Sequence, residues 1–410
     1  MRGTTLVMLA VTLILSGTVW AASSESVIYN FDSLSGGADG YYPYAGLVAD
    51  AKGNLYGTTY NGGNSSSYGV VYELTLSGGT WSQTVLHEFT GGTTDGAYAY
   101  SPLTFDSSGN LYGTTYQGGT YGYGTVYELK KSGSGWTESV IHSFAGYPKD
   151  GAYPYGGTLA FDASGNLYGT THEGGADSVG TVFQMTQSKK GAWTEKTIHS
   201  FTGSNSGEYP IGGLTVGKDG YFYGTTEYGG ATYNAGIVYR LFESRGVWVG
   251  QLVYAFSGGA GGTYPYAGLT MDSTGNFYGT TYQGGANNLG TVYKLKAGKN
   301  NKFTYGVLYS FKGGDTDGEY PYYNDGVVVD SSGNIYGTTY QGGSQDNYGT
   351  VYELKLSSGK YKESVLHAFT GGSSDGCYPE AGLLLLKGNL YGTAVYCGAH
   401  GAGVAFEVTP

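Results

Sequence analysis

The stretch Gly109-Asn110-Leu111-Tyr112-Gly113-Thr114-Thr115-Tyr116-Gln117-Gly118-Gly119 decides the fold, because close copies of it recur along the whole chain. Its Tyr-Gly-Thr core occurs seven times at intervals of 55 to 58 residues, beginning at Tyr56, Tyr112, Tyr168, Tyr223, Tyr278, Tyr336 and Tyr391. A fixed period of this length is typical of solenoids, propellers and other repeat architectures. The sequence therefore predicts seven copies of one structural unit.

Each unit is predicted to contain four β-strands. In the second copy, β-branched and aromatic residues fill four short runs that turn residues separate; the runs are residues 103–105, 111–116, 124–129 and 136–144. No segment has a helical period. Seven units of four antiparallel strands predict an all-β protein, a seven-bladed β-propeller. An open solenoid is the alternative, and it would leave two exposed sheet edges.

The two ends of the chain indicate a closed ring. The last unit supplies only three strands, residues 383–386, 389–395 and 403–408. A spare fourth strand lies near the N-terminus, where residues 26–31 match residues 139–144 of the second unit. We expect this N-terminal strand to pair with the C-terminal blade, because that pairing removes both free edges.

Composition and the N-terminus indicate an exported protein. The 410 residues include 77 Gly, but an aromatic content of 16% supplies enough apolar surface for a core. The net charge of −11 argues against nucleic acid and anionic lipid as partners. Residues 1–22 have the pattern of a secretory signal peptide, with an apolar run followed by Val19-Trp20-Ala21. We expect residues 23–410 to form one monomeric domain, secreted or periplasmic, without membrane insertion.

Topology sorts the loops onto two faces. The loops before the first strand and after the second strand of every unit emerge together, on what we call the motif face. They carry an Asp-Gly-x-Tyr-Pro-Tyr motif and a Tyr-Gln pair. We predict a ligand-binding rim at Tyr42, Tyr60, Tyr116, Gln117, Tyr153, Tyr282, Gln283, Tyr320, Tyr340 and Gln341. The opposite face, which we call the turn face, carries Asp-x-x-Gly-Asn turns that turn chemistry explains.

Two interpretations of the repeated tyrosines remain open. Each tyrosine can be a wedge between neighbouring blades with its hydroxyl hydrogen-bonded, as is usual for buried tyrosine. Alternatively, the aromatic rings stack on sugar faces while Asp, Asn and Gln bond to sugar hydroxyls. Part of the set can serve each role.

Departures from the repeat identify candidate catalytic residues, because a reaction needs unlike groups in unlike positions. Four acidic residues interrupt the motif face: Glu173, Glu227, Asp325 and Glu380. Paired carboxylates across an opening are what glycoside hydrolysis requires. Drift among the repeats explains single substitutions equally well, and the sequence has no Gly-x-Ser-x-Gly or His-Glu-x-x-His motif. Binding is therefore favoured over catalysis, and whether the protein is an enzyme stays open.

The histidines do not predict a metal site. His87, His142, His199 and His367 occupy one slot of the fourth strand, where other units have Tyr29, Tyr254 and Tyr309. Equivalent slots in different blades cannot converge on one ion whose bonds are about 2 Å long. His172 and His400 have no partner at ligand spacing. We predict no metal and no cofactor.

The two cysteines, Cys377 and Cys397, belong to loops on the motif face of the last unit, and no other unit has Cys at either slot. Export permits a disulfide. We predict that this pair forms one and fastens the closing blade; two free buried thiols are the alternative.

The unit Asp-x-x-Gly-Asn-Leu-Tyr-Gly-Thr-Thr-Tyr-x-Gly-Gly, followed by Tyr-Gly-Thr-Val-Tyr-Glu-Leu, resembles the GloVer-type tandem-repeat family of exported bacterial proteins. The resemblance covers the whole mature chain. It implies a bacterial, extracytoplasmic protein and supplies no catalytic residue set.

These observations predict a binding or scaffold module, with polysaccharide or a cell-surface protein as the first candidate partner. A polysaccharide-active enzyme, either a glycoside hydrolase or a lyase, and a purely structural envelope protein are the alternatives. Binding predicts several equivalent aromatic sites, whereas an enzyme predicts one asymmetric acidic cluster.

Overall fold

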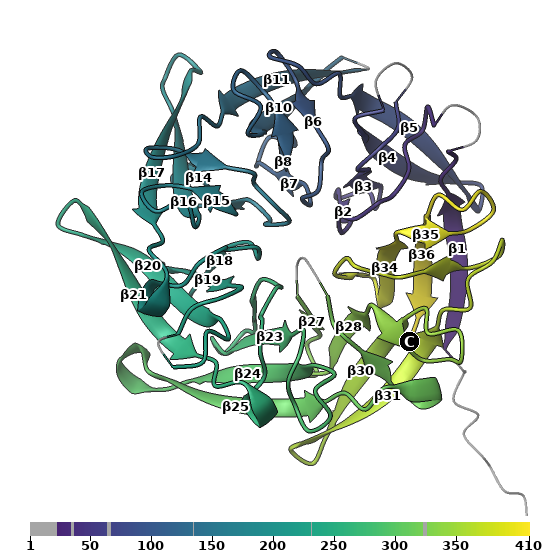
Figure 1. The fold of residues 1–410 in the computed structure, drawn as a ribbon. Helices are drawn as coiled ribbons and strands as arrows, with labels where there is room; N and C mark the ends of the chain where they lie inside the picture. The colour runs from purple at the N-terminus through teal and green to yellow at the C-terminus, as the bar shows by residue number, and fades with distance from the viewer. Residues whose placement is uncertain (1–22, 34–36, 64–66, 134, 231, 323–325) are drawn as a thin grey trace, which may run out of the picture.

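The computed structural model describes residues 23–33, 37–63, 67–133, 135–230, 232–322 and 326–410. Its strands form a ring of seven four-stranded antiparallel sheets (Figure 1), which confirms the predicted seven-bladed β-propeller. The first strand of each blade lies innermost and the fourth outermost.

The first four blades follow one another along the chain. Blade one has β2 (Val48–Ala49), β3 (Leu55–Thr58), β4 (Val70–Ser77) and β5 (Thr80–Glu88). Blade two has β7 (Thr104–Phe105), β8 (Leu111–Thr115), β10 (Thr125–Ser132) and β11 (Gly135–Ser143). Blade three has β13 (Ala160–Phe161), β14 (Leu167–Thr171), β16 (Thr181–Gln187) and β17 (Trp193–Ser200). Blade four has β18 (Thr215–Val216), β19 (Phe222–Thr226), β20 (Ile237–Ser244) and β21 (Val247–Ala255).

The remaining blades complete the ring. Blade five has β22 (Thr270–Met271), β23 (Phe277–Thr281), β24 (Thr291–Ala297) and β25 (Phe303–Ser310). Blade six has β27 (Val328–Val329), β28 (Ile335–Thr339), β30 (Thr350–Ser357) and β31 (Lys360–Ala368). Blade seven has β33 (Leu384–Leu386), β34 (Asn389–Ala394), β36 (Val404–Thr409) and the N-terminal β1 (Ser24–Asn30). Four short 3-10 turns are η1 (Ser204–Ser206), η2 (Gly259–Gly261), η3 (Lys299–Asn301) and η4 (Gly314–Thr316).

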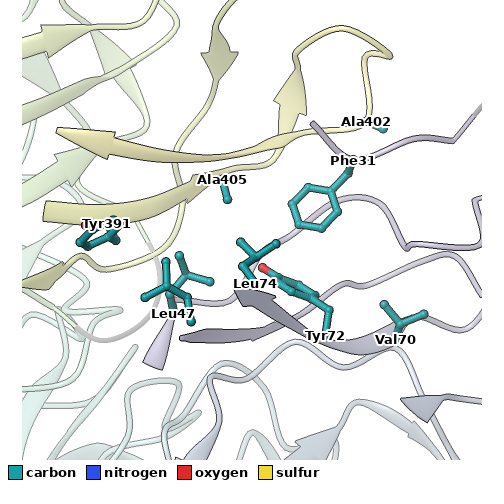
Figure 2. Packing of buried hydrophobic residues seen from close by; sticks show 9 residues of the cluster. Phe31, Leu47, Val70, Tyr72, Leu74, Tyr391, Ala402 and Ala405 are labelled. Carbon is teal, nitrogen blue, oxygen red and sulfur yellow. The ribbon is translucent and has the colours of Figure 1, made fainter. Parts of the chain in front are cut away.

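Pairing of the two chain ends closes the ring as predicted. β1 runs antiparallel to β36, with a register from Ser24↔Thr409 to Asn30↔Val404. Figure 2 shows the apolar cluster behind this seam, in which Phe31 packs with Leu74 of blade one and Ala405 of blade seven. The cluster packs residues of β1 and the adjoining Phe31 against blade one and against the rest of blade seven. The seam therefore has its own apolar core.

Loops on the motif face pair with each other in a way that the strand pattern did not predict. Short ladders join the loop before the first strand to the loop after the second: β6 (Gly96–Ala97) to β9 (Gln117–Gly118), β12 (Gly151–Ala152) to β15 (Glu173–Gly174), β26 (Gly318–Glu319) to β29 (Gln341–Gly342), and β32 (Gly376–Cys377) to β35 (Tyr396–Cys397). Single bridges at Tyr41↔Asn61, Glu208↔Tyr228 and Thr263↔Gln283 take their place in the other blades. This pairing holds the motif-face loops in a repeated geometry.

The glycine of Tyr-Gly-Thr has a packing role. A Cβ at Gly113 would collide with the ring and hydroxyl of Tyr127, which crosses it from the third strand. Tyr127 is fully buried there. Glycine therefore lets two neighbouring strands carry a large aromatic core residue between them.

Among the residues that the structure describes, no helix has the length and apolar character needed to cross a membrane. Residues 1–22, with the predicted signal peptide, lie outside the described part of the chain.

Candidate functional site

The tyrosine that precedes proline in six of the seven motifs, and precedes Ala99 in blade two, joins two blades through its backbone. The N–H of Tyr153 donates to the carbonyl of Tyr123 in the preceding blade at 2.8 Å, and its own carbonyl accepts from His172 N–H at 3.0 Å. Its φ is 53°, an uncommon backbone conformation for a bulky residue. The equivalent residues Tyr42, Tyr98, Tyr209, Tyr264, Tyr320 and Tyr378 have φ between 56° and 63° and corresponding bonds. Seven identical clamps hold this conformation in place.

The rings of the predicted rim tyrosines also pack across blade boundaries. Tyr116 at the end of a second strand meets Tyr153 of the next blade, with ring centroids 5.0 Å apart. The same contact joins Tyr282 to Tyr320 at 5.1 Å and Tyr340 to Tyr378 at 4.9 Å; Tyr60 packs on Tyr98 at 4.8 Å and Tyr42 on Tyr396 at 5.1 Å. All ten of these rings are half-buried. Each ring is therefore partly a wedge and partly open to the motif face.

The three predicted glutamines flank these rings. Gln117 is exposed, while Gln283 and Gln341 are half-buried. Their backbones pair with Ala97, Thr263 and Glu319 in the ladders and the bridge of the motif face. Their assignment to a binding site stays a prediction.

The tyrosine that follows proline was missing from the predicted site, although it belongs to the same motif. Tyr44, Tyr100 and Tyr155 of blades one to three stack in succession, with centroids 4.6 Å and 4.4 Å apart. Tyr266 and Tyr322 meet edge to face at 5.8 Å in blades five and six. These rings therefore form a second set of aromatic contacts between neighbouring blades on the motif face.

Glu380 replaces this inner tyrosine in blade seven. It is only 7% exposed. Burial raises the pKa of its carboxyl to about 8, and a hydrogen bond with the Tyr100 side chain opposes that rise. The raised pKa favours the protonated form, and a protonated carboxyl can donate a hydrogen bond as well as accept one. Next to it, the hydroxyl groups of Tyr44 and Tyr396 lie 3.0 Å apart.

A second acidic cluster lies in blades three and four. His172 stacks on Tyr209 at 4.8 Å. Its Nε2 is 3.8 Å from Glu227 Oε2, and its Nδ1 is 4.0 Å from Glu173 Oε1. Glu227 Oε1 also accepts a hydrogen bond from the hydroxyl of Tyr266 at 3.1 Å. Two carboxylates and an imidazole are thus grouped at one part of the rim.

The four predicted acidic candidates do not form one group. Glu173 and Glu227 meet at His172. Glu380 belongs to blade seven, which lies across the ring from blades three and four (Figure 1). Asp325 lies outside the described residues.

Concave sites also occur on the turn face, between neighbouring blades. A cavity of about 380 Å³ between blades one and two is lined by Asp50, Asp106 and Trp136, among others. One of about 480 Å³ lies between blades five and six, beside Tyr361. Asp50 Oδ1 accepts three backbone N–H groups of its own turn, as turn chemistry predicts. The sequence predicts these turns but not the cavities between them.

The predicted disulfide is present. Cys377 and Cys397 are bonded, with Cα atoms 5.5 Å apart, across the ladder of β32 and β35. This bond fastens the two motif-face loops of the closing blade to each other, and it is compatible with an oxidising compartment.

The fold and the tyrosine rim together define a tandem-repeat β-propeller of seven blades. The chain belongs to the Gloeobacter/Verrucomicrobia repeat family, whose model matches residues 15–239 and 216–410. This confirms the family suggested by the repeat motif. A search of curated proteins gives no match.

Solved structures share the fold at low sequence identity. A protein from Bacteroides uniformis with a provisional assignment as a 6-phosphogluconolactonase is 14% identical, with a TM-score of 0.52 over 78% of this chain and 83% of that one. A Dyadobacter fermentans protein of unknown function has 12% identity and a TM-score of 0.47, covering 95% and 99%. The α-L-arabinanase of Penicillium chrysogenum, complexed with arabinobiose, has 13% identity and a TM-score of 0.43, covering 93% and 97%. At such identities the likeness concerns the fold alone.

Proposed function

We propose that the protein is an exported binding module that holds a polysaccharide chain on the motif face, at the tyrosine rim. The observation that carries this proposal is the half-buried rim itself: rings fixed by interblade stacking still present an open part to solvent. Rigid aromatic groups lose little conformational entropy on binding, and they suit the apolar faces of sugar rings. The disulfide and the signal-like N-terminus support export.

A second candidate function is a polysaccharide-active enzyme. The specific observation that favours it is the pair of unlike acidic environments at the rim. Glu380 is buried with a raised pKa of about 8, whereas Glu227 lies beside His172 in the opposite part of the ring. Glycoside hydrolysis uses two carboxyl groups in different environments, one of which has a raised pKa and acts as the general acid. A cell-surface protein as the partner is the further alternative.

A glycan array with the mature protein would test the binding proposal. A retained glycan is then titrated against Tyr116→Ala and Tyr282→Ala, each of which removes one rim ring. We expect each change to weaken binding about tenfold, equivalent to about 1.4 kcal/mol. Tyr116→Phe keeps the stacked ring and should retain most of the affinity. The rim proposal fails if no glycan binds, or if these variants bind as tightly as the parent.

A matched control lies on the turn face. Tyr221 stacks on Phe242 at 4.6 Å, away from the rim, so Tyr221→Ala removes a stacked ring without touching the motif face. We expect its affinity to be unchanged. Incubating the bound glycan with the protein and analysing its length distinguishes the two functions: shortening that Glu380→Gln abolishes would favour the enzyme.

A further inference from the structure

Three histidines of the fourth strands each lie close to two carboxylates, a grouping that the sequence pattern does not predict. We call these groups the interblade triads: His87–Asp95–Glu138, His142–Asp150–Glu195 and His367–Asp375–Glu25. Within each triad the nearest ligand atoms all lie within 4.8 Å of one another. The histidine comes from the fourth strand of one blade, the aspartate from the following loop, and the glutamate from the fourth strand of the next blade. Each triad therefore spans a blade boundary.

The imidazole and aspartate of each triad are spaced as two ligands of one ion. The Nε2 atoms of His87, His142 and His367 lie 3.4, 3.1 and 3.2 Å from an aspartate oxygen. Two ligands of a tetrahedral zinc ion, with bonds of about 2.1 Å, are about 3.4 Å apart. In the first triad the carboxylate is oriented by backbone N–H groups of Thr90 and Gly96, at 2.7 and 2.6 Å. Such supporting bonds commonly orient metal-ligating carboxylates.

The glutamates bring a second, independent observation. Oε1 of Glu138 and Oε1 of Glu25 are buried, and neither has a hydrogen-bond partner among the described residues; Glu363 Oε1, in the set that contains Tyr309, shares this property. In the remaining triad Glu195 Oε1 accepts one bond, from the hydroxyl of Thr197 at 3.2 Å. A buried carboxylate oxygen without a donor is costly, and it requires either a proton or a cation.

The other blades provide internal comparisons. In the set between blades three and four, Ser206 and Gly250 occupy the positions of the two carboxylates. This set therefore has the imidazole of His199 but neither acidic residue. Tyr309 replaces the histidine where Asp317 and Glu363 are kept, and its hydroxyl donates to Asp317 at 2.5 Å. A phenol thus takes the histidine's place beside the same carboxylates. Three of the seven blade boundaries therefore have a complete set, and each of the other four lacks at least one of its three residues.

We propose that each interblade triad binds one divalent zinc-like ion, so that three ions join three pairs of neighbouring blades. One imidazole nitrogen and two carboxylate oxygens are ligands that zinc accepts, with water in the fourth position. Calcium is a poorer fit because it takes six to eight oxygen ligands. The triad with Glu25 would fasten β1, the strand that closes the ring.

Zinc stoichiometry measured on the untagged protein would test this proposal. After chelator treatment and dialysis, calorimetric titration with Zn²⁺ should give three ions per chain. Glu138→Gln should reduce the number of bound Zn²⁺ ions to two per chain. The double variant Glu138→Gln with Glu195→Gln should bind one. Gln83 stands at the equivalent position of blade one, so the fold accepts glutamine there. Bound Co²⁺ should show the intense visible absorption of a tetrahedral site. This absorption should fall in the same variants and in the same proportion as the Zn²⁺ stoichiometry.

Glu363→Gln is the matched control, because it makes the same change in the set that contains Tyr309 instead of histidine. Its stoichiometry should stay at three. The proposal is overturned if the parent protein binds no Zn²⁺, if Glu138→Gln leaves the stoichiometry unchanged while the circular dichroism spectrum shows a folded protein, or if Glu363→Gln lowers it as well.

Discussion

At the scale of single residues, the third strands contain a tyrosine hydroxyl that the fold does not use. The hydroxyl groups of Tyr72, Tyr127, Tyr239, Tyr293 and Tyr352 are buried and have no hydrogen-bond partner in the described part of the chain. Blades three and seven have Phe183 and Phe406 at this position, where they are equally buried. This position requires a large flat ring. Burying its hydroxyl group without a hydrogen bond lowers the stability of the folded protein.

Tyr127→Phe should therefore raise the free energy of unfolding by about 1 kcal/mol, because it removes a polar group that has no bond to lose. Tyr112→Phe is the control: its hydroxyl donates to Glu128, so the same change should lower the free energy of unfolding by about 1–2 kcal/mol. Urea unfolding of both variants measures the two effects. A loss of stability in Tyr127→Phe equal to that in Tyr112→Phe would contradict this account.

Glu380 should make stability depend on pH. Its pKa is about 8 in the folded protein, against an ordinary value of 4.5, so between these values the folded state holds a proton that the unfolded state has released. The contribution is fully present below pH 4.5 and is lost as pH rises through 8. The stability of the parent relative to Glu380→Gln should therefore fall by up to about 1.4 kcal/mol per pH unit over this range. Thermal or urea unfolding from pH 4 to 9 measures it; a constant difference would show that the carboxyl ionises normally.

At the scale of elements, the closing blade combines a borrowed strand with the disulfide. Cys397 has a φ of 65° at a slot where the other units have glycine, such as Gly118 with a φ of 85°. An L-residue in this conformation costs about 1–2 kcal/mol. The disulfide to Cys377 offsets that cost by restricting the unfolded chain.

Replacing the pair by Cys377→Ala and Cys397→Ala should lower the free energy of unfolding by about 3 kcal/mol. Cys377→Ala with Cys397→Gly restores the residues of blade two, Ala97 and Gly118, and should lose about 1 kcal/mol less. Denaturant unfolding under non-reducing conditions compares the three proteins. Equal losses in the two double variants would show that the backbone at position 397 is unstrained.

The strands and blade order could be predicted because hydrophobic alternation and turn residues recur in every unit. The ladders of the motif face could not, since β6 and β9 consist of loop residues without a strand pattern. The candidate site was predicted only in part. The burial of Glu380 and the contact of His172 with Glu227 depend on how different blades pack. Packing between blades cannot be deduced from the spacing of residues along the chain. For the same reason Glu138 could not be connected with His87.

At the scale of the whole molecule, the ring has no structural beginning. Ser24 pairs with Thr409 as Ser82 pairs with Thr75 in blade one, where residues 76–81 form the end of the hairpin, with its turn at Gly78 and Gly79. β1 and β36 therefore pair like the two strands of a hairpin that lacks its connecting turn. A circular permutant that joins 409 to 24 through a copy of residues 76–81, and starts instead between Gly78 and Gly79, should fold with a melting temperature within a few degrees of the parent. Starting instead inside the buried strand β8, between Gly113 and Thr114, should prevent folding. If every blade tolerates a chain start in its outer turn, the seven blades have a cyclic order, and no single outer turn is required as the place where the chain begins.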